Sequence, residues 1–457
     1  MNAVTGSADT KRYLTGGRLI DGTGDAPQPL HWMELSGDRI TDIEAGEGPG
    51  RPLPPGAVIA VDAAGKTVMP GLIDAHCHIS YGVARGIEEQ DLFGSAEYRS
   101  IRAMYHAQTV LQAGVTSCSD PGGGWYVAVA VRDAVKAGLF PGPRISAAAR
   151  YLSTHAALTD YFPSWVGSPR SGVGVLTEGA SHMVNEVREQ IKNGVDFIKI
   201  AASGESATLT PGGGSVPAFR AEELKVIVDE AHRLGRRVTA HARSGQSVED
   251  CVDAGIDWIM HADFMDRRQA DKLAASGIPC CPTLTFVANV AQWGHIAGCS
   301  QGRLDRFRRD LDLAVTNLDY AWRNGVQMMC GTDTGFAVTP YGEWHARELE
   351  LFVDLLGMSP LQVITCATRN AAVTVDAANL GTLQKGRLAD FLVVDGDPLA
   401  DIRILQDKTR FSAIFQGGRP VDLTPQKPIH RWPWERSLQI SERELYQSTV
   451  TQALAHP

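Results

Sequence analysis

Residues 221–235 read AEELKVIVDEAHRLG and stand between two short apolar runs, VDFIKIA (195–201) and RVTAHA (237–242). The apolar residues of the central stretch recur at the spacing of one helix face; they are Leu224, Ile227, Val228, Ala231 and Leu234. Gly235 follows and can take the left-handed conformation that ends many helices. An amphipathic helix between two apolar runs is typical of a strand–helix–strand unit with parallel strands.

The same alternation continues through the middle of the chain, where eight apolar runs qualify as strands. These runs are GLIDAHCHI (71–79), GVTSCSD (114–120), PRISAAAR (143–150), VDFIKIA (195–201), RVTAHA (237–242), DWIMHAD (257–263), IPCCPTLTF (278–286) and VQMMCGTD (326–333). Eight strands with helical connections over roughly 310 residues predict an α/β fold, the (β/α)8 TIM barrel. A doubly wound sheet is the alternative, but no GxGxxG motif follows the first strand.

Short β-segments separated by glycine and proline turns occupy both ends of the chain, for example at 12–24 and 386–399. We therefore expect one small β-sandwich domain from residues 1–70 plus 385–425, beside a barrel at 71–384. We expect residues 426–457 to form a C-terminal helical tail. The stretch 436–455 in this tail predicts an amphipathic helix that packs on the barrel or on a neighbouring subunit.

Composition restricts the class of protein. The 457 residues are 44% hydrophobic and 21% charged, which is ordinary for a globular chain, and the formal net charge is −9. Since Lys and Arg form no basic face, no nucleic acid is expected as a partner. No apolar run is long enough for a membrane span and no signal peptide is recognisable, so we expect a cytoplasmic protein. Eight cysteines without CxxC spacing predict free thiols. We expect a small-molecule substrate and a homo-oligomer.

Several metal-binding residue types lie at or near the carboxyl ends of predicted strands. His76 and His78 are two residues apart, so a pleated strand directs both imidazoles to one face. The other four each fall on a separate predicted strand; they are Lys199, His241, His261 and Asp333. Barrel enzymes keep their catalytic groups at the carboxyl ends of the strands. The pattern therefore predicts a metal site there.

Together these motifs resemble the amidohydrolase superfamily of metal-dependent hydrolases. The resemblance runs from about residue 16 to residue 402, and its motifs are PGLIDAHCHI (70–79), FIKI (197–200), TAHA (239–242), MHAD (260–263), GTD (331–333), ATRNAA (367–372) and LGTLQKGRLADFLVVDGDPL (380–399). Within the superfamily the chain is most similar to the branch of phenylurea hydrolases, molinate hydrolases and Xaa-Pro dipeptidase-like enzymes.

The resemblance implies two divalent metal ions, with zinc first and manganese, cobalt or iron as alternatives. His76 and His78 would bind the first ion, and His241 and His261 the second. Lys199 would bridge them as an N6-carboxylated lysine, because an ammonium group cannot bind a cation. Its apolar neighbours suit this role, since desolvation lowers the pKa of a lysine and exposes the neutral amine. An unmodified Lys199 paired with an acid is the alternative.

By the same resemblance, Asp333 contacts the first ion and is the catalytic residue that takes a proton from the attacking water. A helix cap is the alternative, because GTDTG is also a good cap sequence. His155, after the third strand, would polarise the substrate carbonyl or stabilise the tetrahedral oxyanion, although Ser153 and Thr154 precede it where relatives usually carry glycines. Met260 stands before His261 where relatives often carry glutamate, so we expect backbone carbonyls to orient the ligands.

We therefore predict a binuclear metal-dependent amidohydrolase that cleaves a C–N bond of an amide, urea or carbamate, with a neutral N-aryl urea as first substrate. The expected loops at the barrel mouth supply aromatic side chains; they are Trp125, Tyr126, Tyr151, Tyr161, Phe162, Trp165, Phe264, Phe286 and Trp293. An Xaa-Pro or related dipeptidase is the second hypothesis, with Arg150, Arg170 or Arg243 for the substrate carboxylate. A non-catalytic metal-binding barrel is the third.

Overall fold

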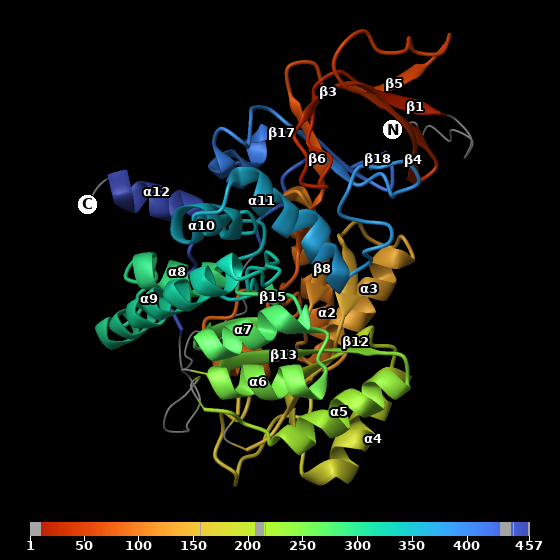
Figure 1. Ribbon diagram of the computed structural model, residues 1–457. Helices are drawn as coiled ribbons and strands as arrows, with labels where there is room; N and C mark the ends of the chain where they lie inside the picture. Colours follow the sequence, from red (N-terminus) through yellow and green to blue (C-terminus); the bar gives the residue numbers. More distant parts are fainter. Residues whose placement is uncertain are drawn as a thin grey trace.

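The computed structural model describes residues 11–155, 157–205, 214, 216–429, 440–441 and 443–455. Strands from both ends of the chain form one sheet, seen in Figure 1 where the red strands lie near blue β17 and β18. Its strands are β1 (Arg12–Thr15), β2 (Arg18–Leu19), β3 (Gln28–Ser36), β4 (Arg39–Ala45), β5 (Val58–Asp62), β6 (Thr67–Pro70), β16 (Phe391–Val394), β17 (Phe411–Gln416) and β18 (Arg419–Pro420). The order is β18-β17-β16-β6-β2-β3-β1-β5, with β4 paired to β3.

Strand β16 joins the two ends of the chain. It pairs antiparallel with β6, where Leu392 lies opposite Met69, and with β17 on its other side. One face of the sheet packs into an apolar core that includes Leu14, Met33 and Phe391, all fully buried. The rings of Phe391 and Phe415 stack at 4.5 Å. Burial of these large side chains is the main favourable term that holds this sheet together.

The middle of the chain forms the barrel. One parallel ladder joins β7, β8 and β9, and a second has the order β11-β10-β12-β13-β14-β15. These strands are β7 (Leu72–Asp74), β8 (Val115–Asp120), β9 (Arg144–Ala147), β10 (Tyr151–Ser153), β11 (Gly174–Leu176), β12 (Phe197–Ala201), β13 (Arg237–Ser244), β14 (Trp258–Phe264) and β15 (Cys280–Cys281). The Asp196 amide donates to the Ala147 carbonyl and so links the two ladders.

Residues 326–334 close the ring. Met328 bridges in parallel to Cys280, and Thr334 bridges in parallel to Cys77. This eighth segment is held by such bridges rather than by a continuous ladder. The predicted third strand (143–150) is a strand only at Arg144–Ala147, and a further strand, β10, follows it. Of the predicted seventh strand (278–286) only Cys280–Cys281 is a strand, because the helix α8 begins at Leu284. With these three differences of detail, the predicted (β/α)8 barrel is confirmed.

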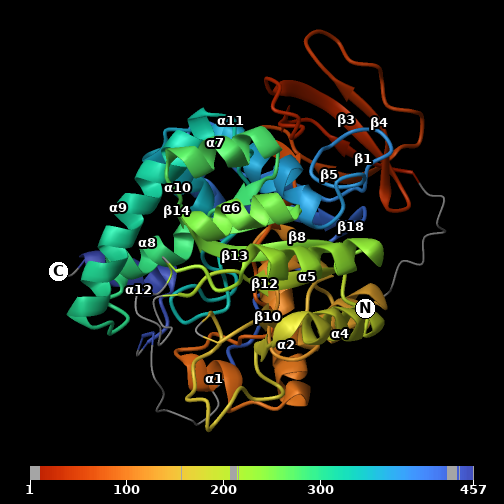
Figure 2. The same cartoon turned by 60° about the horizontal axis from the view of Figure 1, so that its bottom comes forward.

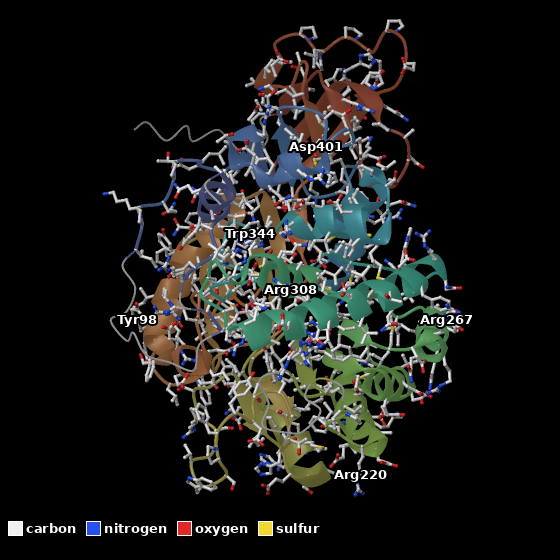
Figure 3. All side chains as sticks on the ribbon, turned by 90° about the vertical axis from the view of Figure 1, so that its left-hand side faces the viewer. Tyr98, Arg220, Arg267, Arg308, Trp344 and Asp401 are labelled. Atoms are coloured by element: carbon white, nitrogen blue, oxygen red, sulfur yellow. The ribbon has the colours of Figure 1, made fainter. Side chains whose placement is uncertain are left out.

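Helices surround the strands, as Figure 2 shows for α4 to α7 around β12 and β13. The helices are α1 (Ile87–Asp91), α2 (Ala96–Gln112), α3 (Val127–Lys136), α4 (Gly179–Lys192), α5 (Ala221–Arg233), α6 (Gly245–Ala254), α7 (Arg267–Ser276), α8 (Leu284–Trp293), α9 (Gln301–Arg323), α10 (Arg347–Leu356), α11 (Pro360–Thr365) and α12 (Gln447–Ala455). In α5 the predicted face is buried at Leu224, Ile227 and Val228, and Gly235 has a φ of 72° as expected. Charged Arg220 and Arg267 point outward in Figure 3.

The end of the chain returns to the barrel. The Ile440 amide donates to the Arg85 carbonyl, and the Leu445 amide donates to the Ala337 carbonyl over 2.7 Å. The indole of Trp344, labelled in Figure 3, donates to the Leu445 carbonyl over 2.6 Å. The helix predicted over 436–455 begins only at Gln447, and residues 436–439 and 442 lie outside the described residues.

Two predictions from composition are tested by the fold. All eight cysteines are free thiols, as expected. Within the described part of the chain, no helix combines the length and apolar character that a membrane crossing requires.

Candidate metal centre

Six ligand-type side chains meet in one cavity of about 650 Å³. The extended residues that follow β7 contribute two, three lie on β12, β13 and β14, and the sixth lies within residues 326–334, which close the ring. They are His76, His78, Lys199, His241, His261 and Asp333. The structure brings together these six residues, which the sequence places on separate predicted strands.

His76, His78 and Asp333 form the tightest group. The Nε2 atoms of His76 and His78 lie 2.9 Å apart. An Asp333 carboxylate oxygen lies 3.4 Å from His76 Nε2 and 3.1 Å from His78 Nε2. With metal–ligand bonds of about 2.0–2.2 Å, two ligands of one ion stand about 2.9–3.5 Å apart. The spacing of these three atoms therefore fits a shared cation.

In three of the histidines, one ring nitrogen already has a hydrogen-bond partner. His78 Nδ1 donates to the Gly122 carbonyl over 2.6 Å, and His241 Nε2 donates to the Gly204 carbonyl over 3.1 Å. His261 Nδ1 contacts the Thr283 hydroxyl at 2.6 Å, and that hydroxyl itself donates to a backbone carbonyl. Each histidine keeps one ring nitrogen with a free lone pair, as a metal ligand requires. Carbonyls orient two of the ligands, as expected, and a hydroxyl orients the third.

The second pair of histidines lies beside the first. The rings of His241 and His261 are 4.5 Å apart, and the rings of His76 and His261 are 5.3 Å apart. Burial lowers the pKa of His241 to about 4 and the pKa of His76 and His261 well below its ordinary value. These imidazoles are therefore neutral at neutral pH, which is the form that binds a cation.

Lys199 lies within this group and is 1% exposed. Burial lowers the pKa of its amine to about 7, although the Asp333 carboxylate favours the charged form. Its Nζ contacts the Met260 thioether at 2.7 Å, and the described residues provide no carboxylate partner within salt-bridge distance. The paired-acid alternative for this lysine therefore has no support in the described part of the chain.

Two of the ligand-type residues have strained backbone. His261 has a φ of 75° and Asp333 a φ of 55°, a region that residues other than glycine rarely adopt. The Asp333 amide donates to the His76 carbonyl, and the Thr339 hydroxyl donates to the Asp333 carbonyl. Such strain persists where surrounding contacts hold it, commonly at functional sites. No helix begins at Asp333, since the next one is capped at Ala346; the cap alternative for Asp333 is therefore wrong.

The buried carboxylate of Asp74 contacts the backbone at His76 and beside Asp333. Asp74 accepts from the amides of His76 and Thr332, and it pairs with His345 Nδ1 at 2.7 Å, with both side chains 1% exposed. Sequence analysis missed this role of Asp74. Its position two residues before His76 on one face of the strand is the signal that could have found it.

The walls of the cavity are largely aromatic. Three of the nine predicted mouth residues line it, namely Tyr151, Tyr161 and Phe286. The other aromatic and polar lining side chains were not predicted; they are Tyr81, Phe307, Phe336, Gln90, Glu205, Ser300, Arg303 and Arg306. The cavity thus combines aromatic surface with a few polar groups.

The three arginines proposed for a substrate carboxylate are not among the described residues that line the cavity. The Arg243 side chain is 4% exposed and binds the carboxylates of Asp263 and Glu205. Arg150 is paired with Glu186 at 3.3 Å, and its guanidinium lies over the ring of Trp125. Arg303 and Arg306 are the arginines that reach the cavity wall.

His155 stands apart from the other expected residues. Its side chain is 57% exposed and lies 3.5 Å from Asp160 and 3.7 Å from Glu178. It does not line the cavity in the described structure. The structure therefore does not bring His155 together with the six ligand-type residues, and its catalytic role stays a prediction.

Comparisons with known proteins agree with this geometry. Residues 67–421 match the amidohydrolase family. An ochratoxinase from Aspergillus niger is 29% identical over 375 residues, which cover 77% of this chain and 75% of that protein. A solved Xaa-Pro dipeptidase with bound methionine has a TM-score of 0.78 at 26% identity, covering 90% of this chain and 99% of that one. Phenylurea hydrolase B shares the fold, with a TM-score of 0.71 at 23% identity and coverage of 92% and 100%.

Proposed function

The chain belongs to the amidohydrolase family, and from this premise we propose that it hydrolyses a C–N bond of an amide, urea or carbamate with two divalent cations. The observation that carries the proposal is the convergence of six ligand-type side chains in one largely aromatic cavity. His76, His78 and Asp333 would hold the first ion, and His241 and His261 the second. Zinc is the first choice, because imidazole and carboxylate ligands suit it.

Lys199 would bridge the two ions as a carbamate. A neutral amine can add to carbon dioxide, and the buried environment of Lys199 favours its neutral form. The carbamate would supply two oxygens at a position where the described residues offer no other bridging carboxylate. Its apolar neighbours Phe197, Ile198 and Ile200 are fully buried.

The chain's own residues can move the protons of the reaction. When bound, the ions supply the Lewis acidity that brings the pKa of water from 15.7 towards about 7. Asp333 accepts a proton as the water oxygen forms a bond to the carbonyl carbon and the π electrons move to the carbonyl oxygen. The C=O bond then reforms, the C–N electron pair leaves with nitrogen, and Asp333 returns the proton to the departing amine.

The aromatic walls support a substrate that carries a ring, and we retain a neutral N-aryl urea as the first candidate. Tyr161 and Phe286 offer the stacking faces that such a ring needs. The second candidate is a substrate with a carboxylate, such as an Xaa-Pro dipeptide or a related amide. Arg303 and Arg306 on the cavity wall favour it, because guanidinium groups bind carboxylates in a bidentate manner.

A hydrolysis screen tests the proposal. Protein reconstituted with zinc, manganese or cobalt is assayed against aryl ureas, N-acyl amino acids and Xaa-Pro dipeptides, with bound metal measured per chain. We expect about two ions, cleavage in at least one substrate class, and loss of turnover after chelation. Cleavage of aryl ureas alone would support the first candidate and exclude the second. A protein that binds two ions and cleaves nothing would favour the non-catalytic barrel.

A further inference from the structure

Gln90 is a buried glutamine on the wall of the metal cavity. It lies on α1 and is 5% exposed. Its backbone amide donates to the Gly86 carbonyl over 3.1 Å, but its side-chain amide has no hydrogen-bond partner in the part of the chain that the structure describes. Neither atom of that amide is one of the polar atoms that are sealed from solvent without a partner. The amide group of Gln90 is therefore open to the cavity and unpaired.

An unpaired amide at this depth is unusual. Burying a polar group without a partner destabilises the folded state, and most buried side-chain amides in proteins are hydrogen-bonded. Gln269 of α7 shows the usual arrangement, since it is 7% exposed and its Oε1 accepts from the Asp266 amide over 2.7 Å. Because Gln90 finds no such partner, its hydrogen bonds are left for a molecule that enters the cavity.

The residues on both sides of Gln90 hold α1 in place. Arg85 binds the Glu89 carboxylate through its backbone amide at 2.9 Å and through its guanidinium at 2.7 Å. Asp91 is 2% exposed and accepts from the Val173 amide over 3.0 Å. The side chains before and after Gln90 are thus anchored to the protein. A polar group whose backbone is fixed in this way is preorganised for recognition of a ligand.

The chemistry of the side chain indicates the group that it binds. A glutamine amide carries an acceptor oxygen beside a donor NH₂. Its complement is an uncharged group that offers an N–H beside a C=O, as a primary carboxamide does. A carboxylate offers acceptors alone and would leave Gln90 Oε1 unpaired. The carboxylate of the neighbouring Asp91 has no cationic partner within salt-bridge distance among the described side chains, so its charge also disfavours an anion here.

We propose that Gln90 is a specificity-determining residue that pairs with an uncleaved carboxamide of the substrate. Gln90 Oε1 accepts from the substrate N–H, and Nε2 donates to the carbonyl oxygen of the same carboxamide. No hydrogen bond joins Gln90 to any of the six ligand-type side chains, so the pairing is separate from the scissile bond. The inference rests on the proposed function and narrows its substrate class to compounds that carry a second carboxamide.

Two series of aromatic amides test the proposal. Derivatives of N-acetylphenylalanine carry the variable group on the leaving amine, and anilides of succinic acid carry it on the acyl part. Each series contains a primary carboxamide, the methyl ester and the carboxylate, which differ only in the group offered to Gln90. Amine release gives kcat and KM for the unaltered metal-loaded protein, Gln90→Leu, Gln90→Glu and the matched control Gln269→Leu. Bound metal and melting temperature are measured on the same preparations.

We expect the unaltered protein to prefer the carboxamide in one of the series, by about fivefold or more in kcat/KM over the ester, which lacks the N–H. Gln90→Leu should lose about 30-fold on the carboxamide, the effect of two neutral hydrogen bonds, and its preference should disappear. Gln90→Glu should lose only about fivefold, because its carboxylate still accepts from the substrate N–H. Bound metal should not change in either variant.

Stability separates this role from a structural one. Gln90→Leu should melt at the same temperature as the unaltered protein or higher, because an apolar side chain replaces an unpaired buried amide. Gln269→Leu should melt lower, since it loses a helix cap, and should keep the carboxamide preference. A lower melting temperature of Gln90→Leu with unchanged selectivity would make Gln90 a structural residue and overturn the inference.

Two further results would overturn it. One is a carboxamide preference that persists in Gln90→Leu. The other is a preference of the unaltered protein for the carboxylate, which would support Arg303 and Arg306 instead. If the metal-loaded protein cleaves neither series, calorimetric binding of benzamide tests the pairing without turnover. Weaker binding by Gln90→Leu would then support the role of Gln90 although the proposed function fails, and equal binding would exclude both.

Discussion

The barrel mouth and the sheet built from both chain ends bury side chains of opposite character. The mouth holds His76, Lys199 and His241 at 1–3% exposure, and two of its ligand-type residues have left-handed backbone. The sheet buries apolar residues such as Leu14 and Phe391, and none of its described residues other than glycine has a positive φ. The difference indicates that the mouth holds costly polar groups and strain in place for chemistry, while apolar packing elsewhere stabilises the fold.

Lys199→Ala should show the largest difference between the two regions, because it should affect turnover and metal binding at the mouth and not the folding of the sheet. We expect it to abolish turnover and to reduce bound metal, because the bridging oxygens are lost, while the sheet stays folded. A small carboxylate such as formate should restore part of both. Lys225→Ala, on the exposed face of α5, is the control. Two bound ions and normal turnover in Lys199→Ala would show that another group bridges the ions.

Asp333→Asn should have the next largest effect. A general base contributes about 10²–10⁴ in rate, so kcat should fall by at least the lower figure. The melting temperature should change little, since no helix cap depends on this carboxylate. Steady-state kinetics, metal content and a thermal melt measure these outcomes together. A near-normal kcat would remove Asp333 from the proton-transfer step.

Phe391→Ala should lower the stability of the protein and leave its catalytic rate unchanged. Phe391 is fully buried against Phe415, so truncation should lower the free energy of unfolding by about 3–5 kcal/mol. Below the new melting transition, kcat and KM per folded molecule should stay as they were. Denaturant unfolding and kinetics on the same preparation test this. A lower kcat at unchanged stability would mean that the sheet acts on the mouth directly.

The smallest predicted effect is a change in stability at acid pH, and it comes from His106, a buried histidine of α2. Its ring stacks on Tyr341, whose hydroxyl donates to the His78 carbonyl. Burial lowers the pKa of His106 to about 3, whereas the unfolded chain takes up this proton near 6.5. Stability should therefore fall as the pH drops from 6.5 towards 3.

His106→Phe should remove the part of this dependence that His106 contributes, about 2 kcal/mol at pH 5, while the parts from His76, His241 and His261 remain. Melting temperatures between pH 7 and pH 4.5 measure it, with His31→Phe in the sheet as the comparison. Parallel curves for the unaltered protein and His106→Phe would show that this ring does not control acid stability.

Sequence alone predicted the barrel and the six ligand-type residues, because both follow from local pattern. Strand periodicity fixes which residues share a face, and the carboxyl ends of parallel strands meet at one rim. His241 and His261 needed no knowledge of loops, since they lie within the bounds of β13 and β14.

Contacts between residues far apart in the sequence, and the paths of loops, could not be predicted from the sequence. The pairing of Asp74 with His345 joins residues 271 positions apart, and no local pattern encodes such a contact. The place of His155 depends on the long connection after β10, whose path is set by packing rather than periodicity. Likewise, which nitrogen of each histidine faces the cavity became clear only from partners such as Gly122 and Thr283.

The return of the chain end to the barrel has a consequence for how new specificities arise. Ile440 lines the cavity and is joined through its backbone to Arg85, yet it lies more than 100 residues beyond Asp333, the last ligand-type residue. Substitution of Ile440 can therefore reshape one wall without altering any ligand-type side chain. A library that varies Ile440 should change which substrates are accepted while leaving metal content constant, so selectivity and the chemical step can diversify independently.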